Sequence, residues 1–200
     1  VKRLRKVVAL ALSAMLCIGA VGCAKDVSSS ADAAKTEIVY ASTKDIMDIN
    51  PHLYTGEMAA QNMVFESLVT INNDGEIEPC LATSWEISED GLEYTFKLRE
   101  DVTVTDEEKF NADAVKQNFD AVLSNFDRHA WLELVNQIDK TEVVDEYTFK
   151  MTLKKAYYPS LTELALTRPF RMISPKCFID GETKNGVNGY AGTGRFVLSE

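Results

Sequence analysis

Residues 79–99 read PCLATSWEISEDGLEYTFKLR, and their pattern is the strongest structural signal in the chain. Apolar and polar side chains alternate with a period of two in 85–88 and again in 94–98. The residues between these runs, Glu89-Asp90-Gly91, are typical of a tight turn. Two alternating runs around such a turn predict an antiparallel β-hairpin with one buried face.

The same pattern returns at residues 141–153. Residues 141–144 and 147–153 alternate again, with Asp145-Glu146 at the turn, and predict a second hairpin. Helices are expected between the hairpins. Asn111 suits an N-cap, and it precedes apolar residues at helical spacing, namely Val115, Phe119, Val122, Leu123 and Phe126. A second helix is expected after Asp127, with an apolar side formed by Trp131, Leu134, Val135 and Ile138.

The flanking regions complete a mixed α/β fold class, with hairpins and helices interspersed. Residues 37–41 are apolar enough for a buried first strand, and residues 196–198 resemble a strand without partners. Another helix is expected from an apolar stripe made of Met58, Met63, Phe65 and Leu68. Residues 37–200 are enough to bury a core. We interpret them as an incomplete stretch of a longer protein.

The N-terminus has the pattern of an export signal. A basic start is followed by an apolar run over residues 7–18, which is too short to span a membrane. The run ends in Gly19-Ala20-Val21-Gly22-Cys23, which resembles the bacterial lipobox. We expect a lipoprotein signal peptide over 1–22, lipidation of Cys23 and a flexible tether over 23–36. The alternative is an ordinary signal peptide with an incidental cysteine.

The charge balance excludes some partners. Without residues 1–22, the chain keeps 17 Lys plus Arg against 31 Asp plus Glu, a net charge of −14. Nucleic acids and anionic membrane surfaces both favour a basic face, so we expect neither as an electrostatic partner.

The sequence offers little for catalysis. Its two histidines, His52 and His129, lie in no nucleophile elbow or zinc motif, and no phosphate-binding loop is present. Cys80 and Cys177 have no metal-site spacing, and we expect two buried thiols rather than a disulfide. The glycines Gly189, Gly192 and Gly194 form only a weak G-x-x-G-x-G pattern. We therefore do not expect an enzyme.

Residues 79–99 resemble the signature of the family 5 extracellular solute-binding proteins of ABC importers. The resemblance continues through Val102, Asp106, Phe110 and residues 111–115. Two positions depart from it, because Val104 stands where the family usually has Phe and Glu107 where it usually has Gly. The change at Glu107 is expected to alter the turn without changing the fold.

Other segments are similar to the nickel-binding members of this family. They are residues 50–55, 128–134, 156–159 continuing to 168–171, and 192–194. Arg195 departs from the pattern, since those proteins have proline there. Together with the signature, the resemblance covers nearly all of residues 37–200.

The resemblance implies a two-lobed protein of the periplasmic-binding-protein type, with this chain supplying most of the first lobe. Its ligand is a nickel ion held by a small chelator such as free histidine or a polycarboxylate. On that pattern Arg128 and Arg168 contact chelator carboxylates, Trp131 covers an apolar or imidazole face, and Tyr54 and Met58 line the pocket. No metal ligand is expected in this chain, since the direct histidine ligand is expected beyond residue 200.

The implied partners are the permease subunits of an ABC importer, and the protein is expected to be a lipid-anchored monomer on the extracytoplasmic face of the cell membrane. Simpler interpretations remain open for the site residues. Arg128 could form an ion pair with Asp127, Trp131 could be core, and Met58 could be core or pocket. The histidines are expected to pack or to lie at the surface rather than to bind. Alternative functions are an oligopeptide- or haem-binding relative and, in another class, a lipid-anchored adhesion or scaffold protein.

Overall fold

The computed structural model describes residues 37–43 and 45–198. The chain divides into a unit that ends at Ala41 and a unit over Ser42–Glu200, and each is described by itself. The predicted signal peptide (1–22) and tether (23–36), with Cys23, lie outside the described residues.

Two strand predictions near the ends of the described chain are wrong. Residues 37–41 form no strand, and their apolar side chains Ile38, Val39 and Tyr40 are exposed. Residues 196–198 form none either, although the Phe196 N–H donates to the Met63 carbonyl at 3.2 Å. An apolar run becomes a strand only where a neighbouring strand binds its backbone N–H and C=O groups, and composition does not reveal that neighbour.

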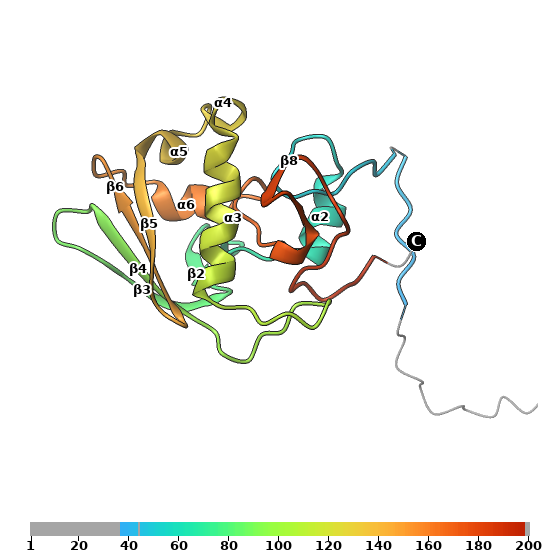
Figure 1. Ribbon diagram of the computed structural model, residues 1–200, viewed down its shortest axis with the longest axis horizontal. Helices are drawn as coiled ribbons and strands as arrows, with labels where there is room; N and C mark the ends of the chain where they lie inside the picture. Colours follow the sequence, from blue (N-terminus) through green and yellow to red (C-terminus); the bar gives the residue numbers. More distant parts are fainter. Residues whose placement is uncertain (1–36, 44, 199–200) are drawn as a thin grey trace, which may run out of the picture. The chain divides into compact units, whose positions relative to one another are not determined.

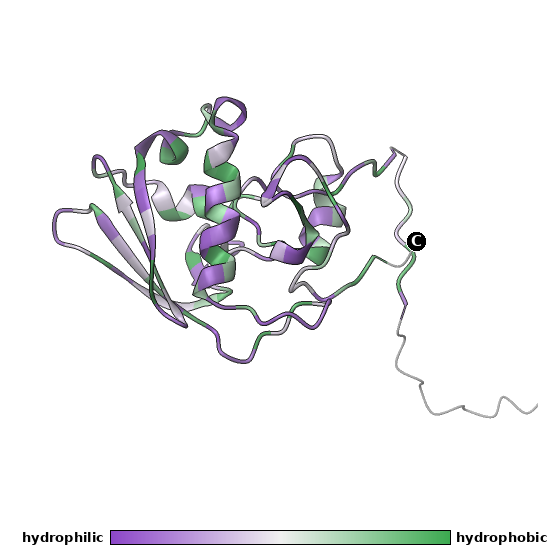
Figure 2. Cartoon of the chain, in the orientation of Figure 1, coloured by the Kyte–Doolittle hydropathy of each residue, from purple (hydrophilic) through white to green (hydrophobic). Residues whose placement is uncertain are grey.

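The two predicted hairpins are confirmed, and they join into one antiparallel sheet (Figure 1). The first is β3 (Ala82–Ile87) with β4 (Glu93–Leu98), and the second is β5 (Ile138–Asp145) with β6 (Thr148–Leu153). The strand order is β3-β4-β6-β5, so the second strand of each hairpin pairs with that of the other. The β3–β4 turn is hydrophilic, as its composition predicts (Figure 2).

One face of this sheet carries the core. Tyr94 lies opposite Met151, and Phe96 opposite Phe149, and all four side chains are buried. The Phe119 ring lies 4.8 Å from that of Phe149, centroid to centroid, and thereby joins the sheet to helix α3 (Ala112–Ser124). Period-two alternation in the strands and helical spacing in α3 thus converge on one hydrophobic cluster.

Helix α3 begins where the sequence predicts. The Asn111 side chain accepts a hydrogen bond from the Ala114 N–H at 2.9 Å, which satisfies one of the free donors of the first turn. The helix lies between the four-stranded sheet and the region of α2 and β8 (Figure 1). Hydrophobic and hydrophilic residues alternate along it, as expected for a helix with one buried side (Figure 2).

The second predicted helix is divided into α4 (Phe126–His129) and α5 (Glu133–Gln137). Trp131 lies between the two and is 64% exposed, and Ile138 begins strand β5 instead of ending a helix. Helical spacing of apolar residues does not reveal a break of this kind, because side chains before and after the break, His129 in α4 and Leu134 in α5, are both buried.

Shorter elements complete the fold. Helix α2 (Met58–Val64) confirms the N-terminal helix, but Phe65 ends it and Leu68 lies beyond it. The remaining elements are β1 (Val69–Ile71), β2 (Ile77–Pro79), α6 (Ser160–Leu164), the 3₁₀ helix η1 (Pro175–Cys177), β7 (Phe178–Ile179) and β8 (Glu182–Val187). A second hydrophobic cluster forms around Val64, Phe65 and Phe178. The mixed α/β prediction is confirmed.

Close backbone contact explains the glycines at 192–194. A Cβ on Gly192 would overlap the Val64 carbonyl, and one on Gly194 would overlap Met63 and Val64. The Gly194 N–H donates to the Val64 carbonyl at 2.9 Å, so this segment binds the end of α2. The glycines therefore serve packing here.

Glu107 has a φ of +68°, a region that favours glycine. The departure at this position keeps the turn, because the Glu107 N–H still donates to the Val104 carbonyl at 2.9 Å. Cys80 and Cys177 are free thiols, with Cys177 buried and Cys80 partly exposed. No helix in the described part of the chain is long and apolar enough to cross a membrane.

Candidate functional site

Four of the five predicted ligand-binding side chains line one pocket of about 210 Å³. They come from segments that are far apart in the sequence: the start of α2 and the residues before it, the break between α4 and α5, and the segment after α6. The lining consists of Tyr54, Met58, Trp131, Leu166, Thr167 and Arg168. Met58 is 54% exposed and Trp131 64% exposed, so neither belongs to the core.

Arg168 is held by two internal hydrogen bonds. Its Nε–H donates to the Gln61 side-chain oxygen at 2.6 Å, and its Nη2 donates to the Gly56 carbonyl. A guanidinium has five N–H donors, so these two bonds leave three donors for a ligand. Burial lowers the pKa of Arg168, but an arginine stays charged at neutral pH. Arg168 therefore offers a fixed positive fork at the pocket.

A second pocket of about 430 Å³ adjoins the first, and the two share Met58 and Arg168. A larger groove of about 710 Å³ lies elsewhere, lined by Tyr94, Tyr157, Tyr158 and other uncharged residues. The larger groove contains none of the predicted site residues and no charged side chain to hold an ionic ligand. The 430 Å³ pocket also contains Asp45 and Glu57, so the 210 Å³ pocket, whose charged lining residue is Arg168, is the better candidate for an anionic ligand.

Tyr54 is fixed by its neighbours. The Trp131 Nε1–H donates to the Tyr54 hydroxyl at 2.9 Å, and the same hydroxyl lies 2.8 Å from His129 Nδ1. Both neighbouring rings meet the Tyr54 ring edge-on. Burial raises the pKa of Tyr54, so it stays a neutral phenol. The pocket thus has an ordered aromatic wall made of Tyr54 and Trp131.

Arg128 does not line the pocket, but it lies next to this wall. Its guanidinium carbon is 5.7 Å from the centre of the Tyr54 ring, within the range of a cation–π contact. Among the described residues, no ion pair joins it to Asp127. Arg128 is exposed, so its charge stays accessible to solvent next to Tyr54.

Of the two positions expected for the histidines, packed or at the surface, the structure shows the first, because both are buried. His52 is 1% exposed, and its Nε2–H donates to the Arg171 carbonyl at 3.2 Å. Its Nδ1 therefore accepts from the Thr183 hydroxyl at 2.9 Å. Burial lowers the pKa of His52 to about 3 and that of His129 to about 4. In residues 37–43 and 45–198, no group of three or more His, Cys, Asp or Glu is placed to hold a metal ion.

A buried polar layer under Arg168 was missed by the sequence reasoning. Asn50 and Gln61 are both fully buried, and the Gln61 amide nitrogen donates to the Asn50 carbonyl at 2.9 Å. The Asn50 amide nitrogen in turn donates to the Thr183 carbonyl at 2.9 Å. Gln61 lies within the apolar stripe of α2, and its polarity on that buried side was the signal that could have revealed this layer.

Comparison with known proteins shows that the chain is similar to extracellular solute-binding proteins. The sequence signature described as "Bacterial extracellular solute-binding proteins, family 5 Middle" matches residues 76–200. The chain is 50% identical over 169 residues to the nickel-binding periplasmic protein of Escherichia coli (strain K12), which covers 84% of this chain and 32% of that protein. The chain thus spans about a third of the length of this curated relative.

Two solved structures are similar to the described fold. NikA from Brucella suis in complex with Fe(III)-EDTA matches with a TM-score of 0.77 and 54% identity, over 78% of this chain and 32% of that one. NikZ from Campylobacter jejuni in complex with Ni(L-His) matches with a TM-score of 0.66 and 30% identity, over 78% of this chain and 31% of that one.

Proposed function

Because this chain belongs to the bacterial extracellular solute-binding proteins of family 5, we propose that the protein containing it captures nickel outside the cell membrane for an ABC importer. The nickel is bound as a complex with a small carboxylate-bearing chelator, such as free histidine or a polycarboxylate. Support comes from the 50% identity to a nickel-binding protein and from two similar structures whose ligands are metal chelates. Delivery goes to the permease subunits of the importer.

The observation that carries this proposal is the convergence of Arg168 with Tyr54, Met58 and Trp131 on one pocket. A guanidinium matches a carboxylate in shape and charge, and an indole face stacks on a flat imidazole. Nickel accepts imidazole and carboxylate ligands, which a small chelator can supply by itself. A pocket that recognises the chelator therefore needs few metal ligands of its own.

The remaining residues have supporting roles in this proposal. Arg128, next to the aromatic wall, adds a second positive charge for a chelator carboxylate. The exposed sides of Trp131 and Met58 are covered when a second lobe closes over the ligand. The direct histidine ligand comes from that lobe, beyond residue 200, because His52 and His129 are both buried and bonded inside this one.

The test is a titration of the full-length protein with nickel, with and without excess free histidine. A hydrogen bond to a charged group contributes about 1.5–3 kcal/mol, so Arg168→Gln should weaken binding of nickel–histidine by roughly 10- to 150-fold. Arg99→Gln is the matched control, because Arg99 pairs with Asp101 and lines none of the pockets described above. Equal affinity for bare and chelated nickel, or an Arg168 variant that binds as well as the wild type, would contradict the proposal.

Lipid anchoring through Cys23 is part of the same proposal, and it rests on the lipobox-like residues 19–23. Cys23→Ala removes the thiol that would accept the lipid. We expect the variant to leave the membrane fraction or to keep its signal uncleaved, as fractionation and mass measurement would show. A Cys23→Ala protein that stays lipidated and membrane-bound would assign the anchor elsewhere.

A further inference from the structure

We propose that Gln61 is a positioning residue of the chelate site. Its uncharged side-chain oxygen holds the Arg168 guanidinium in place and leaves the positive charge available to the ligand. This inference rests on the proposed function and names a residue outside the predicted site. Gln61 is fully buried in α2 and lines neither pocket at Arg168. It acts through Arg168 and does not touch the ligand.

The hydrogen bonds of Gln61 fix the orientation of its amide. Its nitrogen donates to the carbonyls of Ile49 at 3.4 Å and Asn50 at 2.9 Å, and its oxygen accepts from Arg168 Nε at 2.6 Å. The opposite orientation would set the amide nitrogen against an N–H and the amide oxygen against two carbonyls. Because carbonyls lie on one side of the Gln61 amide and a guanidinium on the other, the amide can take only one of its two orientations.

This contact uses only part of the guanidinium. Gln61 and the Gly56 carbonyl bind Nε and Nη2 of Arg168, and Nη1 keeps both of its N–H donors. Both protein acceptors are uncharged, and no ion pair of Arg168 occurs among the described residues. The two hydrogen bonds therefore orient the guanidinium without neutralising it, and the charged group that acts on it from a distance is Glu57, at the edge of the adjoining pocket. A carboxylate at position 61 would still accept from Arg168 and would oppose its charge, but its second oxygen could not donate to the Ile49 and Asn50 carbonyls.

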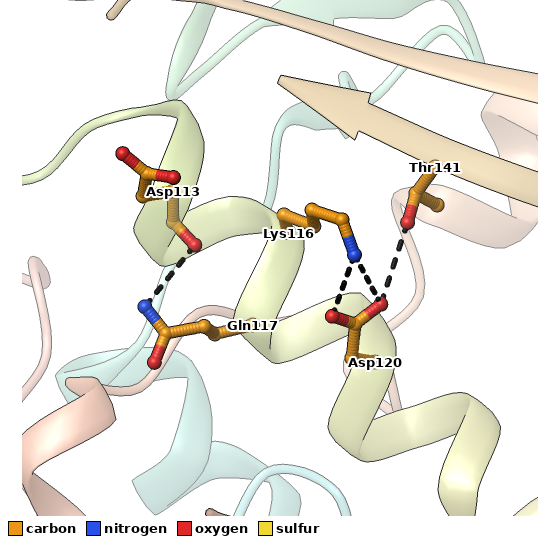
Figure 3. A network of polar contacts seen from close by, with 5 residues as sticks. All are labelled: Asp113, Lys116, Gln117, Asp120 and Thr141. Atoms are coloured by element: carbon orange, nitrogen blue, oxygen red, sulfur yellow. Dashed lines mark hydrogen bonds and ion pairs between the residues drawn. The ribbon is translucent and has the colours of Figure 1, made fainter.

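The chain offers a matched comparison in Gln117. This residue lies on the exposed side of α3, where its amide nitrogen donates to the Asp113 carbonyl at 3.4 Å (Figure 3). Lys116 and Asp120 form a solvent-exposed ion pair on the same side of the helix. Gln117→Glu changes the same atoms and the same net charge as Gln61→Glu, but it leaves Arg168 untouched.

The experiment measures two affinities of the full-length protein, one for nickel–histidine and one for nickel–histamine, which lacks the carboxylate. The proteins are the wild type, Gln61→Glu, Gln61→Met, Arg168→Gln and Gln117→Glu. We expect Gln61→Glu and Gln61→Met to bind nickel–histidine about 10-fold or more weakly. This is the loss implied when the charge-assisted contact between Arg168 and the ligand carboxylate is weakened. The preference for the carboxylate-bearing complex should fall with it, whereas Gln117→Glu should match the wild type.

The ratio of the affinities for nickel–histidine and nickel–histamine distinguishes a positioning role from a purely structural one. A destabilised protein would lose affinity for both complexes alike and keep this ratio. If Gln61→Glu fails to fold, Gln61→Met decides the question. A Gln61→Met protein that keeps the wild-type preference, while Arg168→Gln loses it, would overturn the role of Gln61 alone. A wild-type protein without saturable binding of nickel–histidine would overturn the proposed function, and this inference with it.

Discussion

Acidification should reveal the cost of burying His52 as a neutral ring. His52 is 1% exposed and uses both ring nitrogens in hydrogen bonds to Thr183 and Arg171. Since the carbonyl of Arg171 can only accept, Nε2 carries the hydrogen and Nδ1 has none. A proton on Nδ1 would face the Thr183 hydroxyl inside the protein, and burial accordingly lowers the pKa of His52 to about 3.

The size of the effect follows from the two pKa values. In the unfolded chain His52 has an ordinary pKa of about 6.5, so between that value and about 3 the unfolded state binds the proton and the folded state does not. Stability is therefore complete above about pH 6.5 and falls as the pH drops below it. From about pH 7.5 to about pH 5.0, the free energy of unfolding should fall by ~2 kcal/mol from this one group.

The assay is urea unfolding of the full-length protein at both pH values, with His52→Gln as the reference. The glutamine amide can still donate to the Arg171 carbonyl, and it does not titrate. Carboxylates titrate alike in both proteins, so the difference between the two pH-dependent losses isolates His52. The wild type should lose ~2 kcal/mol more than the variant. Equal losses would show that the buried ring is not what makes the protein acid-sensitive.

Three further predictions test the fold, each by urea unfolding. Phe119→Ala should lower the free energy of unfolding by about 3–5 kcal/mol, because this side chain packs between Phe149 and Phe170. The control, Phe126→Ala at a 43% exposed position, should lower it by about 0.5 kcal/mol. Equal losses in the two variants would contradict the assigned core. Asn111→Ala should cost about 1 kcal/mol through loss of the α3 cap, and an unchanged midpoint would refute it. Glu107→Gly should stabilise by up to about 1 kcal/mol because φ is +68° there, while Glu107→Ala should give no gain.

Local patterns in the sequence predicted the sheet and its main helix well. Residues 85–98 and 141–153 carry both the alternation and the turn residues, and the cap at Asn111 precedes a regular apolar stripe. These signals act over short distances and depend little on the rest of the chain. The pairing of β4 with β6 joins the two hairpins across many residues, and neither hairpin encodes that partner locally.

The site shows a different limit. Tyr54, Met58, Trp131 and Arg168 were predicted from resemblance, and the structure brings them together at one pocket. Gln61 was missed because its importance depends on Arg168, which lies 107 residues further along the chain. The break between α4 and α5 was missed as well, although it is what exposes Trp131. Spacing on one helix cannot reveal contacts that depend on another segment.

The separation between the pocket wall and the core has an evolutionary consequence. Tyr54, Met58, Trp131 and Arg168 belong to neither hydrophobic cluster. Substitution of a side chain outside the core usually changes stability by only about 0.5 kcal/mol. Selection can therefore exchange the exposed Met58 and Trp131 while the inherited scaffold remains intact, whereas Tyr54 and Arg168 are bonded to the buried His129 and Gln61. Gln61 also binds the backbone, so a lineage that replaces Arg168 inherits an amide without its partner.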